Sequence, residues 1–275
     1  SLSSVVAPEI REFERASTTV ANAYIKPLAR DYLDALGSRL GDRAITAPLL
    51  LMLSSGGLTH VGEVRRSPVQ MLESGPAAGA LAAADIGRAE GLEHVLAFDM
   101  GGTTAKLCLI DGDEPDIAYR FEAARERRFA EGSGLPIRIS TVELIEIGAG
   151  GGSIARIDAL GLLKAGPDSA GAVPGPVAYG RGGTAPTVTD ADFALGFLGA
   201  EGFAGGAIEV DLAATRDALE KLAEQADLSA EKIAWGVHDL VNENMASAAR
   251  VHIAEKGRDP RAYTLVATGG AGPVH

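Results

Sequence analysis

The chain of 275 residues is 46% hydrophobic and 23% charged, so it is long enough for one large domain or two moderate ones with a real core. Its net charge of −12 argues against a nucleic-acid-binding surface, and no apolar run approaches the roughly 20 residues needed to cross a bilayer. The single cysteine, Cys108, excludes an intrachain disulfide and fits a reducing compartment, so we expect a cytoplasmic protein.

The N-terminal stretch predicts a long helix. Its apolar residues recur mostly at three- and four-residue spacing: Ile10, Phe13, Val20, Tyr24, Leu28, Tyr32 and Leu36. We expect the helix to begin near Pro8, because proline is favoured in the first turn of a helix. We expect Pro27 to kink or split it near the middle, and Gly37 and Gly41 to end it.

The next predicted elements are a strand, a second helix and a pair of strands. Residues 49–53 form a short apolar run typical of a buried strand, and an alanine-rich run to Ile86 predicts a helix that packs closely. From residue 94 a new unit begins, in which the apolar runs 95–98 and 107–110 indicate strand, tight turn and strand.

The rest of the chain predicts strands first and helices later. Four segments follow the paired strands: a strand at 117–121, a solvated charged excursion at 122–131, an extended segment at 137–147 and an irregular Gly/Pro-rich stretch at 161–186. Three helices and a strand come last. The first helix is capped by the segment 187–190, where Thr189 or Asp190 can accept from its first N–H groups, and runs through 198. The others are the helices from 211 or 213 to 222 and 229–257, and the strand 263–267.

The turn between the paired strands carries the groups that a phosphate and its magnesium ion require. They are the carboxylate of Asp99, the backbone of Gly101 and Gly102, the hydroxyls of Thr103 and Thr104, and the amine of Lys106. Glycines let a phosphate approach the backbone, and a carboxylate holds magnesium directly or through water. The alternatives are structural: an ordinary Gly-Gly turn, an aspartate that accepts bonds in its own turn, threonines chosen for the strand, and a solvent-facing lysine.

Glycine-rich loops follow four apolar runs, at 55–57, 101–104, 148–153 and 269–272. Ligands of an α/β sheet bind where strands end and loops begin, so the four loops together indicate a phosphate or nucleotide site. This adds Gly150 and Gly151 from the third loop to the candidate residues.

Other polar residues give weaker signals. Asp190 could reach a binding cleft, although a helix cap is its simpler role. The histidines, which show no metal-ligand spacing and predict no zinc site, are His60, His94, His238, His252 and His275. His275 could line a nucleotide pocket, and Cys108 is expected to be a small buried side chain. No residue stands out as a general base.

A faint internal repeat concerns the organisation of the chain. A helix, a strand and a Gly-Gly loop occur near residue 56 and again near residue 269, which indicates duplication of one α/β unit or a chance likeness of common loops. The first copy continues past its loop and the second does not. We therefore expect a fragment in which residues 1–90 end one lobe and residues 91–275 form most of a second.

Eight segments together resemble the hydantoinase A/5-oxoprolinase family over essentially the whole chain. They are PEIREFERASTTV at 8–20, SSGG at 54–57, ESGPAAG at 73–79, FDMGGTTAK at 98–106, IGAGGGSI at 147–154, GPVAYGRGG at 175–183, PTVTDA at 186–191 and TGGAGPVH at 268–275. The resemblance implies an α/β, actin-like ATPase (ribonuclease H-like) fold with a mixed sheet flanked by helices. It also implies ATP and Mg²⁺ as cofactors.

The same resemblance implies roles and partners. Asp99, Gly101, Gly102, Thr103 and Thr104 would form a phosphate hairpin, with Asp99 at the metal; near the adenosine would lie Gly269, Gly270 and Gly272. The implied activity is ATP-dependent opening of a cyclic amide of the hydantoin or 5-oxoproline type. The alternatives are a ketone carboxylase subunit and a non-catalytic nucleotide-binding module. A hydantoinase B-like partner subunit or fused region is expected, and a homo-oligomer is left open.

Overall fold

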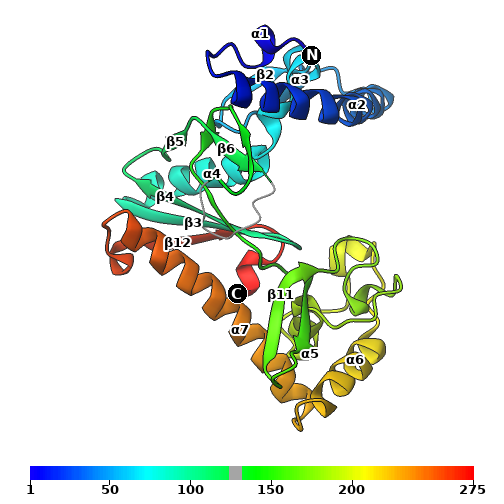
Figure 1. Cartoon of the computed structure of the whole chain (residues 1–275). Coiled ribbons are helices and arrows are strands. Elements are labelled where there is room, and N and C mark those ends of the chain that lie inside the picture. Colours follow the sequence, from blue (N-terminus) through cyan, green and yellow to red (C-terminus); the bar gives the residue numbers. More distant parts are fainter. Residues whose placement is uncertain (124–131) are drawn as a thin grey trace. The chain divides into compact units, whose positions relative to one another are not determined.

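The computed structural model describes residues 1–123 and 132–275, which form two compact units (Figure 1). The first unit comprises Ser1–Glu93 and Ile110–Glu143, and the second comprises His94–Leu109 and Leu144–His275. From residue 124 on, the charged excursion predicted at 122–131 lies outside the described residues. The assignment of residues 1–90 and 91–275 to two actin-like lobes remains a prediction.

The long N-terminal helix is present and ends one residue after Gly41, but the interruptions predicted at Pro27 and Gly37 are wrong. After the short helix α1 (Ser3–Val6), helix α2 runs without a break over Glu12–Asp42 and includes Pro27, Gly37 and Gly41. A proline removes one backbone hydrogen-bond donor, and a glycine lowers helix stability by about 1 kcal/mol relative to alanine. The many other backbone hydrogen bonds of a long helix are enough to keep it continuous through such residues.

Helix α2 packs through polar side chains on its buried face. Asn22 Oδ1 accepts from the Val69 backbone N–H at 3.1 Å, and Thr18 Oγ1 accepts from the Arg138 N–H at 2.8 Å. The apolar residues whose spacing predicted the helix are largely exposed, with Tyr24 85% and Leu28 75% accessible. The period therefore identified the helix correctly without identifying its buried face.

The other elements of the first unit are short apart from one helix. Strands β1 (Leu50–Met52) and β2 (Leu58–His60) pair antiparallel. The strand expected at 49–53 is therefore present as β1, but its expected burial is wrong, because Leu50 is exposed and the other two residues are only partly buried. The alanine-rich helix is confirmed as α4 (Ser74–Glu90). The remaining elements around this unit are α3 (Val61–Arg66), β5 (Ile117–Ala118), β6 (Phe121–Ala123), β7 (Leu135–Ile137) and β8 (Thr141–Val142).

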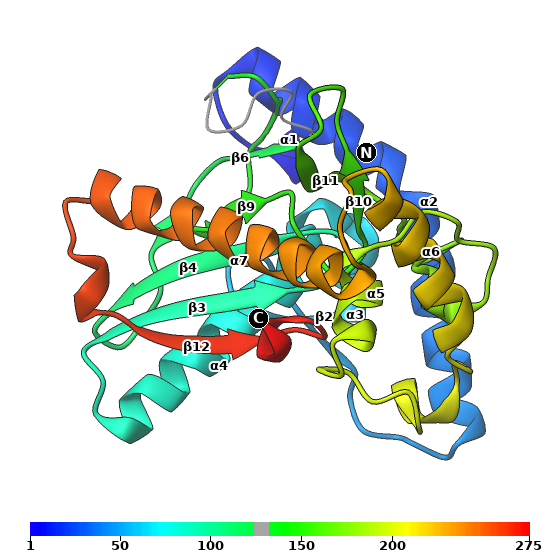
Figure 2. The same cartoon turned by 90° about the horizontal axis from the view of Figure 1, so that it is seen from below.

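A mixed sheet organises the second unit. Its strand order is β12-β3-β4-β9, formed by β12 (Thr264–Thr268), β3 (His94–Met100), β4 (Ala105–Asp111) and β9 (Ile145–Ile147). β12 runs parallel to β3, whereas β9 runs antiparallel to β4. Helix α7 (Ala230–Glu255) lies along this sheet (Figure 2). The core contains Phe98 and Leu107 from the strands with Val241 and Met245 from the helix.

A second layer of elements follows the sheet in the chain. β10 (Ser153–Ile157) pairs antiparallel with β11 (Leu163–Ser169), so the expectation of little regular structure after residue 161 is wrong over this strand. β11 contains Gly166 and Pro167, which obscure a strand in the sequence. The antiparallel pairing with β10 holds residues 163–169 in the extended conformation of a strand.

Two shorter helices complete the unit. Helix α5 (Val188–Ala194) ends earlier than expected, and α6 (Leu212–Glu224) follows it. Asp211 and Ser229 cap α6 and α7 through their side chains, as their residue types favour. Among the described residues, no helix has the length and apolar character that a bilayer-spanning segment needs.

Candidate functional site

Asp99 stands at the end of β3 with its carboxylate unpaired. The residue is opposite Thr268 on the parallel strand β12 and is partly buried. Across the described ranges, its carboxylate accepts no hydrogen bond and forms no ion pair. The turn therefore does not use this side chain for its own closure, which leaves the oxygens available to a cation.

The turn 101–104 closes through its backbone. The Gly101 N–H donates to the Thr104 carbonyl at 3.0 Å, while the exposed Gly102 and Thr103 donate no backbone hydrogen bond within the part of the chain that is described. Thr103 Oγ1 lies 3.4 Å from Ser169 Oγ, which adds a hydroxyl to this edge. Ser169 was not among the predicted site residues, because it belongs to the strand β11, which the sequence did not predict.

The loop 148–153 packs directly on this turn. The Gly151 N–H donates to the Gly101 carbonyl at 3.0 Å, and the Gly152 N–H donates to the Gly102 carbonyl at 2.6 Å. A Cβ atom at Gly150 would come within 2.7 Å of the Gly102 and Thr103 backbone. Only glycine permits this approach, so the loop 148–153 packs directly against the turn 101–104.

The C-terminal glycine loop reaches the same place from β12. Gly269 has φ +84°, and a Cβ there would overlap Asp99 Oδ1 and the Met100 carbonyl. The Ala271 N–H donates to the Met100 carbonyl at 2.9 Å, and a Cβ at Gly272 would lie 3.7 Å from the Phe98 ring. This loop therefore borders the Asp99 carboxylate.

Three of the four predicted glycine-rich loops thus converge at one edge of the sheet. The fourth, at 55–57, belongs to the first unit, where a Cβ at Gly56 would meet the side chain of Leu81. Neighbouring Ser54 is buried and donates to the Gln70 carbonyl at 2.7 Å. These contacts give that loop a packing role within its own unit.

Lys106 has a partner on the neighbouring strand. It is opposite Glu146 of β9, and its Nζ lies 3.1 Å from that carboxylate. Its amine is therefore engaged in a cross-strand ion pair, which makes it a weaker candidate for a phosphate contact than the turn backbone.

Asp190 is a buried capping residue. Thr187 is the N-cap of α5, and Asp190 accepts from the Thr187 backbone N–H and hydroxyl, both at 2.8 Å. It also accepts from the N–H groups of Val177 and Ala178. Burial raises the pKa of the Asp190 carboxyl, and these hydrogen bonds oppose the rise. The predicted capping role is confirmed, although the N-cap itself is Thr187 rather than Thr189 or Asp190.

Known proteins resemble this chain in both sequence and fold. The crystal structure of ATP-dependent caprolactamase from Pseudomonas jessenii matches at 38% identity with a TM-score of 0.72, over 98% of this chain and 38% of that one. An acetone carboxylase nucleotide-free structure matches at 28% identity with a TM-score of 0.84, over 99% and 37%. 5-Oxoprolinase 1 of Arabidopsis thaliana is 35% identical over 100% of this chain and 22% of its own length.

These matches define how much is shared. The chain spans less than half the length of these relatives, and the α/β, actin-like fold implied by the resemblance is confirmed. The family model described as hydantoinase/oxoprolinase matches residues 15–275. With nearly the whole chain covered, the protein belongs to the hydantoinase/oxoprolinase family.

Proposed function

We propose that this chain supplies the ATP-binding part of an enzyme that opens a cyclic amide at the expense of ATP. The observation that carries the proposal is the convergence of three glycine-rich loops around the unpaired Asp99 carboxylate. Close backbone approach, free N–H groups and a carboxylate are what a nucleotide phosphate with its cation requires.

The residues fit the proposed cofactors. The N–H groups of Gly102 and Thr103 would donate to phosphate oxygens, and the hydroxyls of Thr103 and Ser169 would add donors. Mg²⁺ would be held at Asp99 and would offset the phosphate charge. Gly269 and Gly272 would leave room for the rest of the nucleotide beside β12.

The chemistry follows from the stability of the amide. ATP would supply a phosphoryl group to the amide oxygen, with loss of ADP, which turns a poor leaving group into a good one. Water would then add to the amide carbon, the ring C–N bond would break with the amine leaving, and a second water would hydrolyse the resulting acyl phosphate to the carboxylate and free phosphate. The chain's own part is to orient the phosphates and stabilise their charge.

The relatives support this reading of the site. One is named ATP-dependent caprolactamase and another 5-oxoprolinase, and each of these enzyme names refers to a substrate that is a cyclic amide. The caprolactamase relative is a subunit alpha, and a further relative is an acetone carboxylase beta subunit. We therefore propose a partner subunit of the hydantoinase B type.

A ketone carboxylase is the second candidate. Its support is the fold comparison, in which the acetone carboxylase structure gives the higher TM-score although caprolactamase is closer in sequence. The same phosphoryl activation, applied to an enolate or to bicarbonate, would serve carboxylation.

The test is ATP hydrolysis by the intact protein with its partner subunit. Hydantoin, 5-oxoproline, caprolactam, and acetone with bicarbonate are each compared with no substrate, and the Asp99→Asn variant provides the control. Stimulation by a cyclic amide supports the proposal, whereas stimulation only by ketone with bicarbonate establishes the carboxylase. ATP binding with no stimulation by any of them would favour a non-catalytic nucleotide-binding module.

A further inference from the structure

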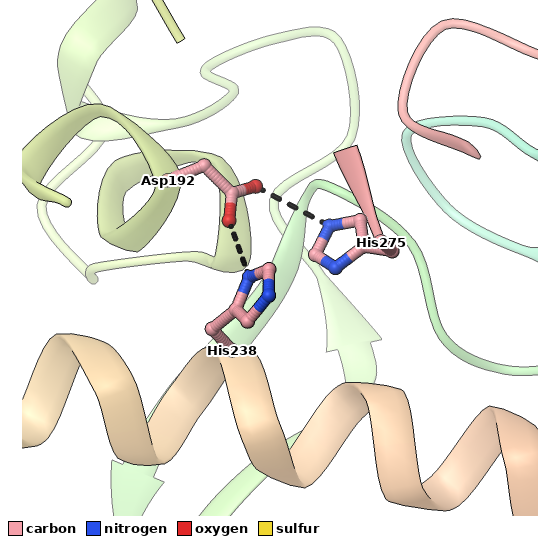
Figure 3. A group of neighbouring side chains, drawn as sticks. All are labelled: Asp192, His238 and His275. Carbon is pink, nitrogen blue, oxygen red and sulfur yellow. Dashed lines mark hydrogen bonds and ion pairs between the residues drawn. The ribbon is translucent and has the colours of Figure 1, made fainter. Parts of the chain in front are cut away.

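Three polar side chains from distant parts of the second unit meet in its interior (Figure 3). Asp192 comes from α5, His238 from α7, and His275 follows the C-terminal glycine loop. Their side chains are 3%, 8% and 0% exposed. The cluster is separate from the groups that would bind phosphate, and the proposed function assigns it no role.

Both histidines face the same carboxylate. Asp192 Oδ1 lies 3.0 Å from His238 Nδ1, and Oδ2 lies 3.3 Å from His275 Nε2. The three candidate ligand atoms all lie within 4.8 Å of one another. Two atoms bound to one tetrahedral ion at about 2.1 Å are about 3.4 Å apart, so the spacing of the ligand atoms suits a shared ion. The two rings stack with 23° between their planes, so one ring would rotate for both nitrogen lone pairs to point at the ion.

The nitrogen of His275 that faces Asp192 has no hydrogen-bond partner among the residues that the structure describes. Its other nitrogen, Nδ1, lies 3.0 Å from Asn242 Oδ1, an oxygen that can only accept. Nδ1 therefore carries a proton, and in the neutral ring Nε2 presents a lone pair. This Nε2 is buried, and none of the described residues forms a hydrogen bond with it. A lone pair directed at a carboxylate is unfavourable unless a proton or a metal ion lies between them, and either would make this pair attractive.

Asn242 supplies the outer contact that a metal-bound histidine requires. A ligating imidazole commonly donates its second N–H to a fixed oxygen, which sets its tautomer and orientation. Asn242 lies one helical turn after His238 on α7, so one face of that helix provides both a ligand and the support for another. His275 and Asn242 also border a cavity of about 520 Å³, which brings open space next to the cluster.

We propose that Asp192, His238 and His275 form a binding site for a divalent transition-metal ion, with Zn²⁺ as the representative ion. Two imidazole nitrogens and one carboxylate oxygen are an established ligand set for such ions. The N–H of Thr189 on α5 holds the Gly151 carbonyl at 2.7 Å, so the ion would brace the helix that supports the phosphate turn. Its role would be structural, because the cluster is buried.

The experiment measures zinc binding to the intact protein after chelation. Wild type is compared by calorimetry and metal analysis with Asp192→Asn, His238→Gln and His275→Gln. His252→Gln is the matched control, because His252 is also a buried histidine of α7 but lies outside the cluster. Co²⁺ provides a second probe, whose visible absorption reports nitrogen and oxygen ligation.

We expect wild type and His252→Gln to bind one more equivalent of zinc than the cluster variants do, or to bind it at least about tenfold more tightly. The thermal midpoint of wild type should rise with zinc, and that of the cluster variants should rise less. Three different cluster variants guard against one that fails to fold. Equal stoichiometry and affinity in wild type and every folded cluster variant would overturn the proposal and leave a hydrogen-bonded network only.

Discussion

Replacing Gly150 by alanine tests whether the loop 148–153 supports the turn 101–104 and whether that turn binds phosphate. The added Cβ would lie 2.7 Å from Gly102 C and from Thr103 N and C, all of them backbone atoms that cannot rotate away. Relief of this overlap must separate the two loops. Separation would lengthen the hydrogen bonds from Gly151 N–H to Gly101 O, now 3.0 Å, and from Gly152 N–H to Gly102 O, now 2.6 Å.

The structure sets the size of the effect. Overpacking a close contact costs about 1–3 kcal/mol, and each lost hydrogen bond costs about 0.5–1.5 kcal/mol. The free energy of unfolding should therefore fall by about 2–6 kcal/mol if neither loop relaxes. The affinity for Mg-ATP should fall by at least about tenfold, because the displaced turn no longer presents its donors in register.

Denaturant unfolding and calorimetric titration of the intact protein with Mg-ATP measure both quantities. Gly148→Ala is the matched control, because a Cβ at that position would meet only Pro167 Cβ, at an ordinary 3.4 Å. Equal stability and equal nucleotide affinity in the two variants would refute the packing of loop 148–153 on the turn. Lower stability with unchanged affinity would show that the turn does not bind phosphate.

Three further changes test single residues. Asp99→Asn should weaken Mg-ATP binding at least about tenfold while the melting midpoint stays close to wild type; unfolding without selective loss of binding would make Asp99 structural. Lys106→Met should change the nucleotide Kd less than about twofold and remove a pair with Glu146 worth about 0–1 kcal/mol, so a large loss of affinity would restore its phosphate role. Because burial raises the pKa of Asp190, its folded carboxyl favours the proton, and its contribution to stability is largest at low pH and declines through the folded pKa. The free energy of unfolding of wild type minus that of Asp190→Asn should therefore fall from about pH 4 to about pH 7, and a rise would contradict the burial argument.

Local patterns succeeded where the responsible groups are neighbours in the chain. The apolar runs on either side of the turn 101–104 predicted β3 and β4 correctly, because strand and turn preferences depend on residues only a few positions apart in the chain. The helix starts predicted at 211 or 213 and at 229 depend on side-chain hydrogen bonds within one helical turn, which the structure shows at Asp211 and Ser229. Apolar spacing also predicted helix α2 but not its buried face. The spacing of residues along a helix does not say which other elements pack against it.

Long-range contacts account for what the sequence left open. Strand β11 was missed because its conformation depends on pairing with β10, and Lys106 was assigned to phosphate because its cross-strand neighbour Glu146 is 40 residues away. The glycine-rich loops were recognised one by one, but only the fold shows that three of them meet at Asp99.

The histidine cluster shows the same division most clearly. His238 and His275 have no metal-type spacing in the sequence, yet their rings stack with centroids 4.8 Å apart beside Asp192. By itself the sequence determined the residue types, the local turns and the family resemblance, since these depend on covalent neighbours. Tertiary structure alone decided which of these groups share a site, because that depends on how helices and strands distant in the chain pack against one another.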